Sequence, residues 1–449
     1  MPRYSRMFTL PGRGFVGWRP LTLWAGAALI GFVALFLGKG AAFVFHFFTR
    51  MTADYPWWPF VSLPAGGILL TWFMARVGAG TEGSGIQQAV AAMQVAESPA
   101  KVGWFVNLRL AGAKFIALLM GTASGFVVGL EGPTVQIGAS ILYTFRHFLP
   151  QDNAILRRQL VMAGGAAGIA AAFSAPLAGL MFAFEELGRH VSPRGTARTS
   201  IAVVLSGTMA YAVSNRVNYF GQVHLTQRPT LYVLGILCLI TLAGALVGGA
   251  FSWLAIRTDK WMPRKMLFFR MHHPYIFVVI CGVLVGICGL AAPVFGSGVE
   301  VTRHLLHGDM AVEWYYLPLK LVALLLTNLT GIPGGIFAPS LSLGAGVGSW
   351  FLPLAGAQWQ GEILAVGMVA VLSAATRAPL TAAFIMIEMT NGHAMVLEML
   401  AASMLAAQSA RYFHVRFYHD LAQRALHMMP DLPESDHRPF WGGLFGKRP

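Results

Sequence analysis

Long apolar stretches recur along almost the whole chain. They begin with 21–37 and continue with 60–74, 115–129, 161–184 and 231–256. Because an α-helix needs roughly 20 apolar residues to cross a bilayer, this pattern predicts an all-α protein that crosses the membrane several times. Several stretches are shorter than that or are interrupted by Gly and Pro. Such interruptions are typical of broken and re-entrant helices that meet inside the membrane.

The chain also repeats three motifs in the same order. They are GSGI at 83–86 with GSGV at 296–299, GLEGPT at 129–134 with GIFAPS at 335–340, and AFSAPLAGLMFAFEE at 172–186 with ATRAPLTAAFIMIEM at 375–389. One GSG among 51 glycines carries no information, but three ordered matches at similar spacings indicate an internal duplication.

Basic residues orient the two halves, because Lys and Arg beside membrane spans tend to stay in the cytoplasm. Arginines precede the first apolar stretch, whereas the equivalent stretch at 231–256 is followed by basic residues. The halves therefore cross in opposite directions, which predicts an inverted-topology repeat. We expect four parts, with both termini in the cytoplasm: a cytoplasmic segment at 1–20, a first membrane repeat at 21–215, a second at 231–411, and a C-terminal helix and cytoplasmic tail at 412–449.

Composition narrows the class of protein further. With 56% hydrophobic and 11% charged residues, the chain is neither a soluble globular enzyme nor a disordered protein. In a membrane protein the net charge of +14 indicates basic cytoplasmic loops rather than a nucleic-acid partner. Cys238, Cys281 and Cys288 lie in apolar runs, where we expect reduced core thiols and no disulfide framework.

The Gly and Pro residues of the repeated motifs stand where helices are expected to begin. Gly85, Gly132 and Gly335 permit close backbone approach, and Pro133 and Pro339 suit a first helical turn. Helix N-termini inside the membrane present free N–H groups and a partial positive charge, so the pattern predicts a site for a small anion. The alternative is that the glycines only permit tight helix packing.

Three acidic residues lie in or at the end of apolar segments. Each such residue costs roughly 2.5 to 3.5 kcal/mol to insert into a membrane, which makes it a functional candidate. Glu131, at a predicted helix start, could compete with an anion for N–H groups when ionised and withdraw when protonated. Glu185 matches Glu388 in the repeat, and a solvated interfacial role remains an alternative for Glu185. Glu186 has no acidic counterpart, which makes it the better functional candidate.

At these motifs the sequence resembles the CLC family of chloride channels and proton-coupled chloride antiporters, over about residues 20–425. The resemblance implies a homodimer with one pathway in each subunit, chloride and protons as the transported ions, and no cofactor or metal. The regulatory pair of cytoplasmic domains found in eukaryotic members is missing, so we expect a multi-pass protein of the bacterial inner (plasma) membrane.

The resemblance assigns four chloride-binding residues. Ser84 would coordinate the central anion with its hydroxyl, and Ile336 and Phe337 would supply backbone N–H groups. Tyr418, in FYHDLAQRAL, would meet the anion from the cytoplasmic side. A serine at position 84 favours chloride, because nitrate-preferring members typically carry proline there and fluoride-specific members methionine.

The resemblance also assigns the proton pathway. Glu131 would be the gate and outer proton acceptor, and Glu186 the inner proton-transfer residue that many antiporters have and channels generally lack. Lys114 resembles a buried lysine that raises the local positive potential. The supporting positions are Gly83, Gly85, Gly132, Pro133, Gly335 and Pro339.

Two departures from the family motifs leave open questions. Gln87 replaces the proline that usually follows GSGI, and this change affects the geometry of the anion site. Leu130 replaces the basic residue that usually precedes Glu131, and this change affects the electrostatic field of the outer vestibule. Chloride/proton antiport is the leading hypothesis. A passive voltage- or pH-gated chloride channel on the same scaffold is the nearest alternative. An intramembrane enzyme is remote, since no HExxH, GxSxG or GxGD motif occurs.

Overall fold

The computed structural model describes residues 18–149, 152–188, 193–214, 220–221 and 230–430. Within these residues the chain is helical and contains no β-strand beyond one isolated bridge, so the all-α prediction is confirmed. Most of the predicted segments at 1–20 and in the tail after 430, together with the linker between the repeats, lie outside the described residues.

The helices fall into two series. The first comprises α1 (Trp18–Asp54), α2 (Pro59–Arg76), α3 (Ile86–Gln94), α4 (Pro99–Phe105), α5 (Leu108–Ser124), α6 (Glu131–Thr144), α7 (Ala154–Phe173), α8 (Pro176–Phe182) and α9 (Pro193–Ser214). The second comprises α10 (Leu231–Ile256), α11 (Thr258–Trp261), α12 (Arg264–His272), α13 (Pro274–Ala291), α14 (Val299–His307), α15 (Tyr316–Thr330), α16 (Phe337–Ala355), α17 (Gln360–Thr376), α18 (Pro379–Thr390) and α19 (Val396–Ser409), followed by α20 (Phe417–His427).

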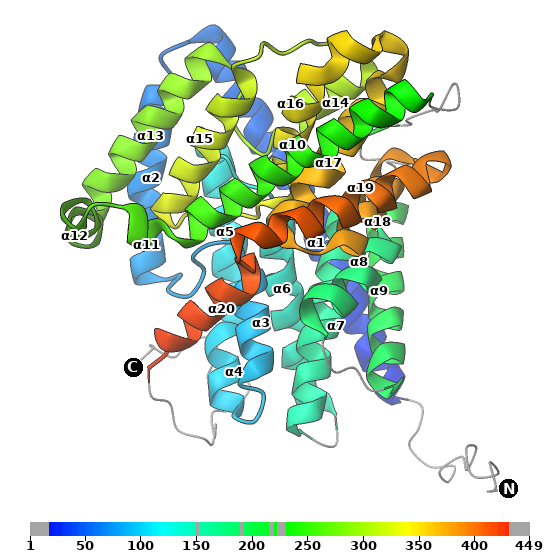
Figure 1. The fold of residues 1–449 in the computed structure, drawn as a ribbon. Coiled ribbons are helices and arrows are strands. Elements are labelled where there is room, and N and C mark those ends of the chain that lie inside the picture. Colours follow the sequence, from blue (N-terminus) through cyan, green and yellow to red (C-terminus); the bar gives the residue numbers. More distant parts are fainter. Residues whose placement is uncertain (1–17, 150–151, 189–192, 215–219, 222–229, 431–449) are drawn as a thin grey trace, which may run out of the picture.

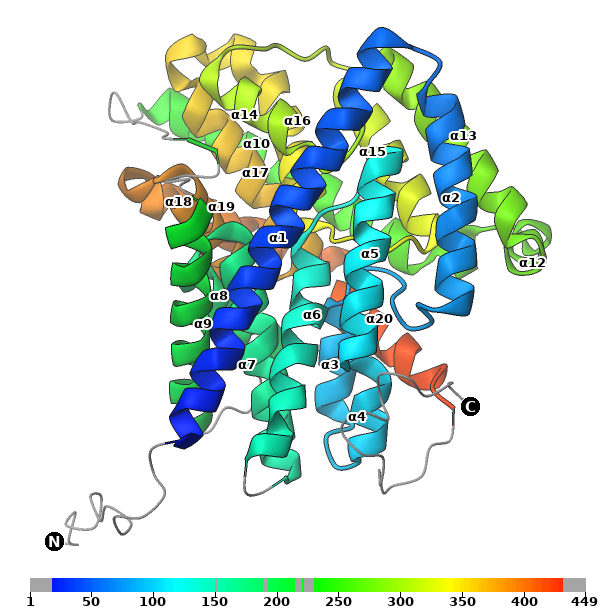
Figure 2. The ribbon, with the colours of Figure 1, turned by 180° about the vertical axis from the view of Figure 1, so that it is seen from behind.

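Five helical segments of the described chain are long and apolar enough to cross a membrane. They are Leu21–Asp54, Pro99–Ser124, Leu231–Ile256, Pro274–Ala291 and Ala357–Thr376. The first belongs to α1, a tilted helix of 37 residues that runs almost the full height of the molecule (Figure 1, Figure 2). The start of α1 and the end of α20 lie toward the same end of the molecule (Figure 2).

Short helices that begin at the centre of the molecule confirm the inverted repeat. Gly129 and Gly335, just before α6 and α16, exchange backbone hydrogen bonds of 2.9 and 2.8 Å in an antiparallel bridge. From this bridge α6 and α16 run in opposite directions (Figure 2). A Cβ on Gly335 would lie 2.7 Å from the backbone nitrogen of Gly132, so only glycine permits this approach.

Two glutamates at equivalent places in the repeats cap each other's helices. The Glu185 carboxylate accepts the first N–H groups of α18 at 2.9 and 2.6 Å, and also the Thr381 hydroxyl at 2.8 Å. The Glu388 carboxylate accepts the first N–H groups of α8 at 3.1 and 2.8 Å. Carboxylates are favourable at helix N-termini. These bonds indicate a structural role for Glu185, whose side chain is partly exposed.

The apolar stretch 161–184 is not one continuous helix. Ser174 takes a left-handed conformation (φ 52°) between α7 and α8, and Pro176 then opens the new helix. The second repeat turns in the same way at Arg377 (φ 59°), before Pro379. Hydrophobicity alone does not reveal this corner, because the residues on both sides of it are apolar.

One of the three predicted core thiols is not in the core. Cys281 and Cys288 are buried, but Cys238 lies on the exposed face of α10. Its helical neighbours Leu234 and Leu242 are exposed as well. In a membrane protein an exposed apolar face contacts lipid, so an apolar sequence context does not by itself indicate burial.

Candidate functional site

Three loop-to-helix junctions meet where α3, α6 and α16 begin. Gly85 precedes α3 in a left-handed conformation (φ 108°), and a Cβ on it would lie 2.6 Å from the Gly132 carbonyl oxygen. A Cβ on Gly132 would overlap the Ser84 hydroxyl and lie 3.1 Å from the Gly335 Cα. The three predicted glycines therefore bring three helix N-termini, with their free N–H groups, into one place.

Glu131 is the first residue of α6, and its side chain is only 1% exposed. The carboxylate turns toward the opposite repeat, where Oε2 accepts the Ala338 N–H at 3.5 Å. The same oxygen lies so close to Gly129 that a Cβ there would be 2.5 Å away. The acid therefore occupies the positive N-terminus of α16, which is also a favourable place for an anion.

Ser84 and Tyr418 come from opposite ends of the sequence and lie close together. Both are buried, and their hydroxyl groups are near enough to interact. Neither hydroxyl makes a hydrogen bond of ordinary geometry with any residue that the structure describes. A buried polar group without a partner costs about 1–3 kcal/mol. Two such donors side by side fit a ligand that accepts hydrogen bonds.

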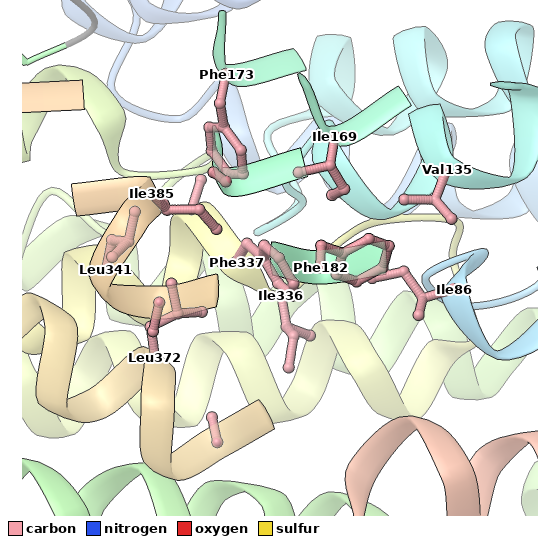
Figure 3. Packing of buried hydrophobic residues seen from close by; sticks show 14 of the residues in the cluster. Ile86, Val135, Ile169, Phe173, Phe182, Ile336, Phe337, Leu341, Leu372 and Ile385 are labelled. Atoms are coloured by element: carbon pink, nitrogen blue, oxygen red, sulfur yellow. The ribbon is translucent and has the colours of Figure 1, made fainter. Parts of the chain in front are cut away.

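Aromatic rings fix the position of this pair. The Tyr418 ring lies 6.0 Å from that of Phe337, which stacks on Phe173 at 6.2 Å and meets Phe182 edge-on at 6.2 Å. Figure 3 shows Phe173, Phe182, Ile336 and Phe337 gathered between the two repeats. Ile336 precedes α16 and Phe337 opens it, so their N–H groups have no acceptor within the helix.

Glu186 lies outside the helix junction, in the segment that follows α8. It belongs to a π-helix, η2 (Ala183–Leu187), and its side chain is half-buried. Glu186 and Glu131 are both within electrostatic range of the Tyr418 hydroxyl. Glu186 also lines a cavity of about 360 Å³ beside the start of α20. π-Helical turns are frequent at functional sites.

Lys114 is fully buried, and its bonds go to the backbone. Its ammonium group donates to the carbonyl oxygens of Thr81 and Gly83 at 2.6 and 2.7 Å. Lys320, which the sequence reasoning missed, does the same in the second repeat, with the Val294 and Gly296 carbonyls at 2.7 and 3.0 Å. The signal that could have found it is the repeat itself, since both lysines precede the equivalent helix starts by the same number of residues.

The two departures from the family motifs have structural consequences. The Gln87 side-chain oxygen accepts the Gly85 N–H at 3.2 Å, and its amide donates to the Glu82 carbonyl at 3.4 Å. Gln87 therefore caps the start of its own helix next to Ser84. Leu130 lines a second cavity of about 420 Å³, to which Lys39 of α1 contributes a positive charge.

Among the described residues, no three His, Cys, Asp or Glu side chains gather as a metal site would require. The buried polar groups at the helix junction are hydroxyl and N–H donors together with one carboxylate. This set suits a small anion and exchangeable protons better than a cation.

The chain is similar to known proteins in both sequence and fold. A family model described as "Voltage gated chloride channel" matches residues 66–411. The "H(+)/Cl(-) exchange transporter ClcA" of Yersinia pestis bv. Antiqua (strain Angola) is 29% identical over 424 residues, which cover 88% of this chain and 85% of that protein. The crystal structure of a slow cyanobacterial Cl-/H+ antiporter superposes with a TM-score of 0.76 at 22% identity, covering 91% of this chain and 98% of the other. A CLC-type fluoride/proton antiporter superposes with a TM-score of 0.75 at 22% identity, covering 90% and 98%.

Proposed function

Because the chain belongs to the voltage-gated chloride channel family, we propose that it is a membrane antiporter that exchanges chloride for protons. The relative from Yersinia pestis carries the name of a proton/chloride exchanger. The observation that carries the proposal is that two acids, Glu131 at the start of α6 and Glu186 in the π-helix that lines the cavity, both lie within electrostatic range of the Tyr418 hydroxyl. A passive anion path needs only one gate, whereas two acids in series support a proton path as well.

Chloride binds where the three helix starts meet. The hydroxyls of Ser84 and Tyr418 donate to the ion, and the N–H groups of Ile336 and Phe337 supply the rest of its shell. Buried donors without protein partners replace the water that the ion gives up. The N-termini of α3, α6 and α16 add partial positive charge without placing a full cation beside the ion, so chloride can also leave.

Glu131 is the gate and the outer proton acceptor. When ionised, its carboxylate holds the Ala338 N–H at the start of α16 and so competes with chloride for the same helix terminus. When protonated, it loses the charge that the helix N-terminus favours and moves away. Each opening for chloride therefore requires a proton at the gate, and this requirement couples the two ions.

Glu186 is the inner proton-transfer residue. Glu186 belongs to η2 and lines the cavity of about 360 Å³, so it lies apart from the residues that bind chloride. From there it passes protons to Glu131. Glu185, the neighbour of Glu186 in sequence, caps α18, and we therefore assign the inner proton transfer to Glu186 and not to Glu185.

Lys114 and the glycines support the site. The lysine holds the loop of Thr81 and Gly83, which presents Ser84, and adds a positive charge behind it. Gly83, Gly85, Gly132 and Gly335 allow the close approach of the loops, while Pro133 and Pro339 lie in the first turns of α6 and α16.

The decisive experiment records chloride flux and proton flux together from purified protein in liposomes. Wild-type protein is expected to move protons against their gradient when a chloride gradient is imposed. Glu131→Gln should abolish proton movement while chloride still passes with little dependence on pH, because the neutral side chain no longer closes the path. Glu186→Gln should also abolish proton movement but leave chloride binding unchanged and the residual chloride flux sensitive to external pH.

The contrast between the two variants carries the test. A reversal potential set by chloride alone in the wild-type protein, whatever the proton gradient, would instead identify a passive channel on this scaffold. Full proton coupling in Glu186→Gln would move the inner proton route to another acid.

We further propose that the protein works as a homodimer in the bacterial inner membrane, with a complete pathway in each subunit and both termini in the cytoplasm. The basic residues that follow α10 and flank α20 support this orientation.

A further inference from the structure

The cavity beside Glu186 is lined on most of its rim by basic and polar side chains. It measures about 360 Å³ and lies between the corner that precedes α18, the end of α19 and the start of α20. Its lining includes Arg377, Arg411, Arg416, His419 and Gln408. The anion site of the proposed function uses none of these residues.

The three arginines outnumber the two acids that line this cavity, Glu185 and Glu186. The Glu185 carboxylate is already bound by the first N–H groups of α18, which leaves Glu186 as the acid that faces the arginines. Arg411 and Arg416 both lie within electrostatic range of Arg377, where like charges repel. Within the described residues, none of the three forms an ion pair. Asp420, which is also within range of Arg377, accepts the backbone N–H of Arg416 at 3.0 Å, so its charge is engaged at the start of α20.

The corner itself does not require an arginine. Arg377 adopts a left-handed conformation (φ 59°) that is uncommon for residues other than glycine, and the equivalent corner of the first repeat carries Ser174 (φ 52°). The Arg377 guanidinium is anchored by one bond, from Nη1 to the Val415 carbonyl oxygen at 3.2 Å. The same residue lines the cavity.

We propose that this cavity binds a phosphate-bearing polyanion and that the bound molecule slows transport. Guanidinium groups match phosphate oxygens through paired N–H donors, and several of them together select multivalent anions. A single chloride ion would pair with only one of the three guanidinium groups and would leave most of this volume unfilled. Two sources of phosphate fit this chemistry, a soluble molecule and a lipid headgroup. The second is included because Tyr412, next to Arg411, is 84% exposed and so brings this edge of the cavity to the surface of the chain.

The regulatory half of the inference rests on the proposed function, whereas the binding half does not. Glu186 lines the same cavity, and His419 follows Tyr418 directly in α20. A polyanion held there lies across the approach to Glu186. It therefore reduces proton delivery to Glu186, and the coupled chloride flux falls with it.

Binding is measured by calorimetry with pyrophosphate and purified protein in nanodiscs of phosphatidylcholine, at fixed chloride and ionic strength. We expect wild-type protein to bind, and Arg411→Gln/Arg416→Gln to bind at least tenfold more weakly. The control Arg264→Gln/Lys265→Gln removes two exposed charges from α12 and should change affinity less than twofold. Absence of binding to the wild-type protein, or equal binding to the Arg411→Gln/Arg416→Gln variant, overturns the site.

The source of the phosphate is tested by repeating the titration in phosphatidylglycerol. Weaker pyrophosphate binding there, in wild type but not in the Arg411→Gln/Arg416→Gln variant, supports a lipid headgroup as the occupant. Unchanged binding supports a soluble one.

Regulation is tested in liposomes loaded with pyrophosphate, which should slow chloride flux in the wild type and not in the Arg411→Gln/Arg416→Gln variant. Binding without any effect on flux overturns the regulatory half alone. Failure of proton coupling without pyrophosphate would count against the proposed function and not against this site.

Discussion

At the scale of single residues, the two serines of the GSG loops have different surroundings. Ser84 is buried beside Tyr418, whereas Ser297 lines the cavity of about 420 Å³ that also contains Lys39. The same motif therefore presents one hydroxyl to the junction of helix starts and the other to a separate cavity. A comparison of the two positions isolates the contribution of the site from that of the loop.

We expect Ser84→Pro to raise nitrate transport relative to chloride. The substitution removes a hydroxyl donor whose hydrogen bond to an ion contributes about 1.5–3 kcal/mol, which is roughly a tenfold or larger loss of chloride affinity. Anion exchange in liposomes with chloride and nitrate measures the preference. Ser297→Pro is the matched control and should leave it unchanged. An unaltered preference in folded Ser84→Pro would remove Ser84 from the anion site.

Sequence reasoning reached most of the residues at this junction because they lie in contiguous motifs. Ser84 and Glu131 each adjoin a glycine at a helix start, and Phe337 follows Gly335 by two residues. The glycines indicated the helix starts, and the family resemblance assigned Ser84 and Phe337 to the anion. The bonds of Glu185 were not predictable, since the N–H groups that donate to it lie in α18, some 195 residues away along the chain. Lys320 was missed because its apolar neighbours resemble an ordinary span.

At the scale of helices, the reciprocal caps of α8 and α18 make a testable contribution to stability. Glu185→Gln replaces charge-assisted bonds to two N–H groups with weaker ones and should cost about 1–3 kcal/mol. Thermal unfolding in detergent is expected to shift downward by a few degrees. Proton coupling should persist, because Glu186 remains.

Two further variants serve as comparisons for the thermal shift of Glu185→Gln. Glu388→Gln, at the equivalent position, should shift the unfolding temperature by a similar amount. Glu300→Gln, in an exposed pair with Arg303, should leave it nearly unchanged. Loss of proton coupling in Glu185→Gln without any thermal shift would contradict the structural role and assign Glu185 to the proton route.

The boundaries of the helices were predictable only in part. The stretch 231–256 coincides with α10, because a fully apolar run bounded by polar residues ends where the helix ends. The stretch 161–184 is divided between α7, α8 and the π-helix, because the turn at Ser174 depends on a backbone conformation that hydrophobicity does not encode.

At the scale of the whole molecule, both repeats of one chain contribute to a single site. Ser84 and Glu131 come from the first, and Phe337 and Tyr418 from the second repeat and the helix after it. A cross-linked dimer of one wild-type and one Glu131→Gln subunit is therefore expected to retain about half of the coupled proton transport. Proton flux per dimer in liposomes measures this fraction. Complete loss would place the pathway between subunits.

The inverted arrangement was predictable because three motifs recur in order and the basic residues change sides. The surface through which two subunits would associate was not. Leucine, isoleucine and phenylalanine cover faces that contact lipid as readily as faces that contact protein, so composition does not distinguish them. Exposed Leu231, Leu246 and Leu397 illustrate the difficulty, since all three are apolar and open in the isolated chain.

The exchange of carboxylates between the repeats also has an evolutionary consequence. Glu185 serves α18 as Glu388 serves α8, which is the reciprocity of a contact between two identical partners. The fold thus has the form of an antiparallel dimer joined into one polypeptide. An ancestral half of this protein would have needed to insert into the membrane in both orientations. In the two present halves the basic residues lie on opposite sides, and this placement favours one orientation for each half.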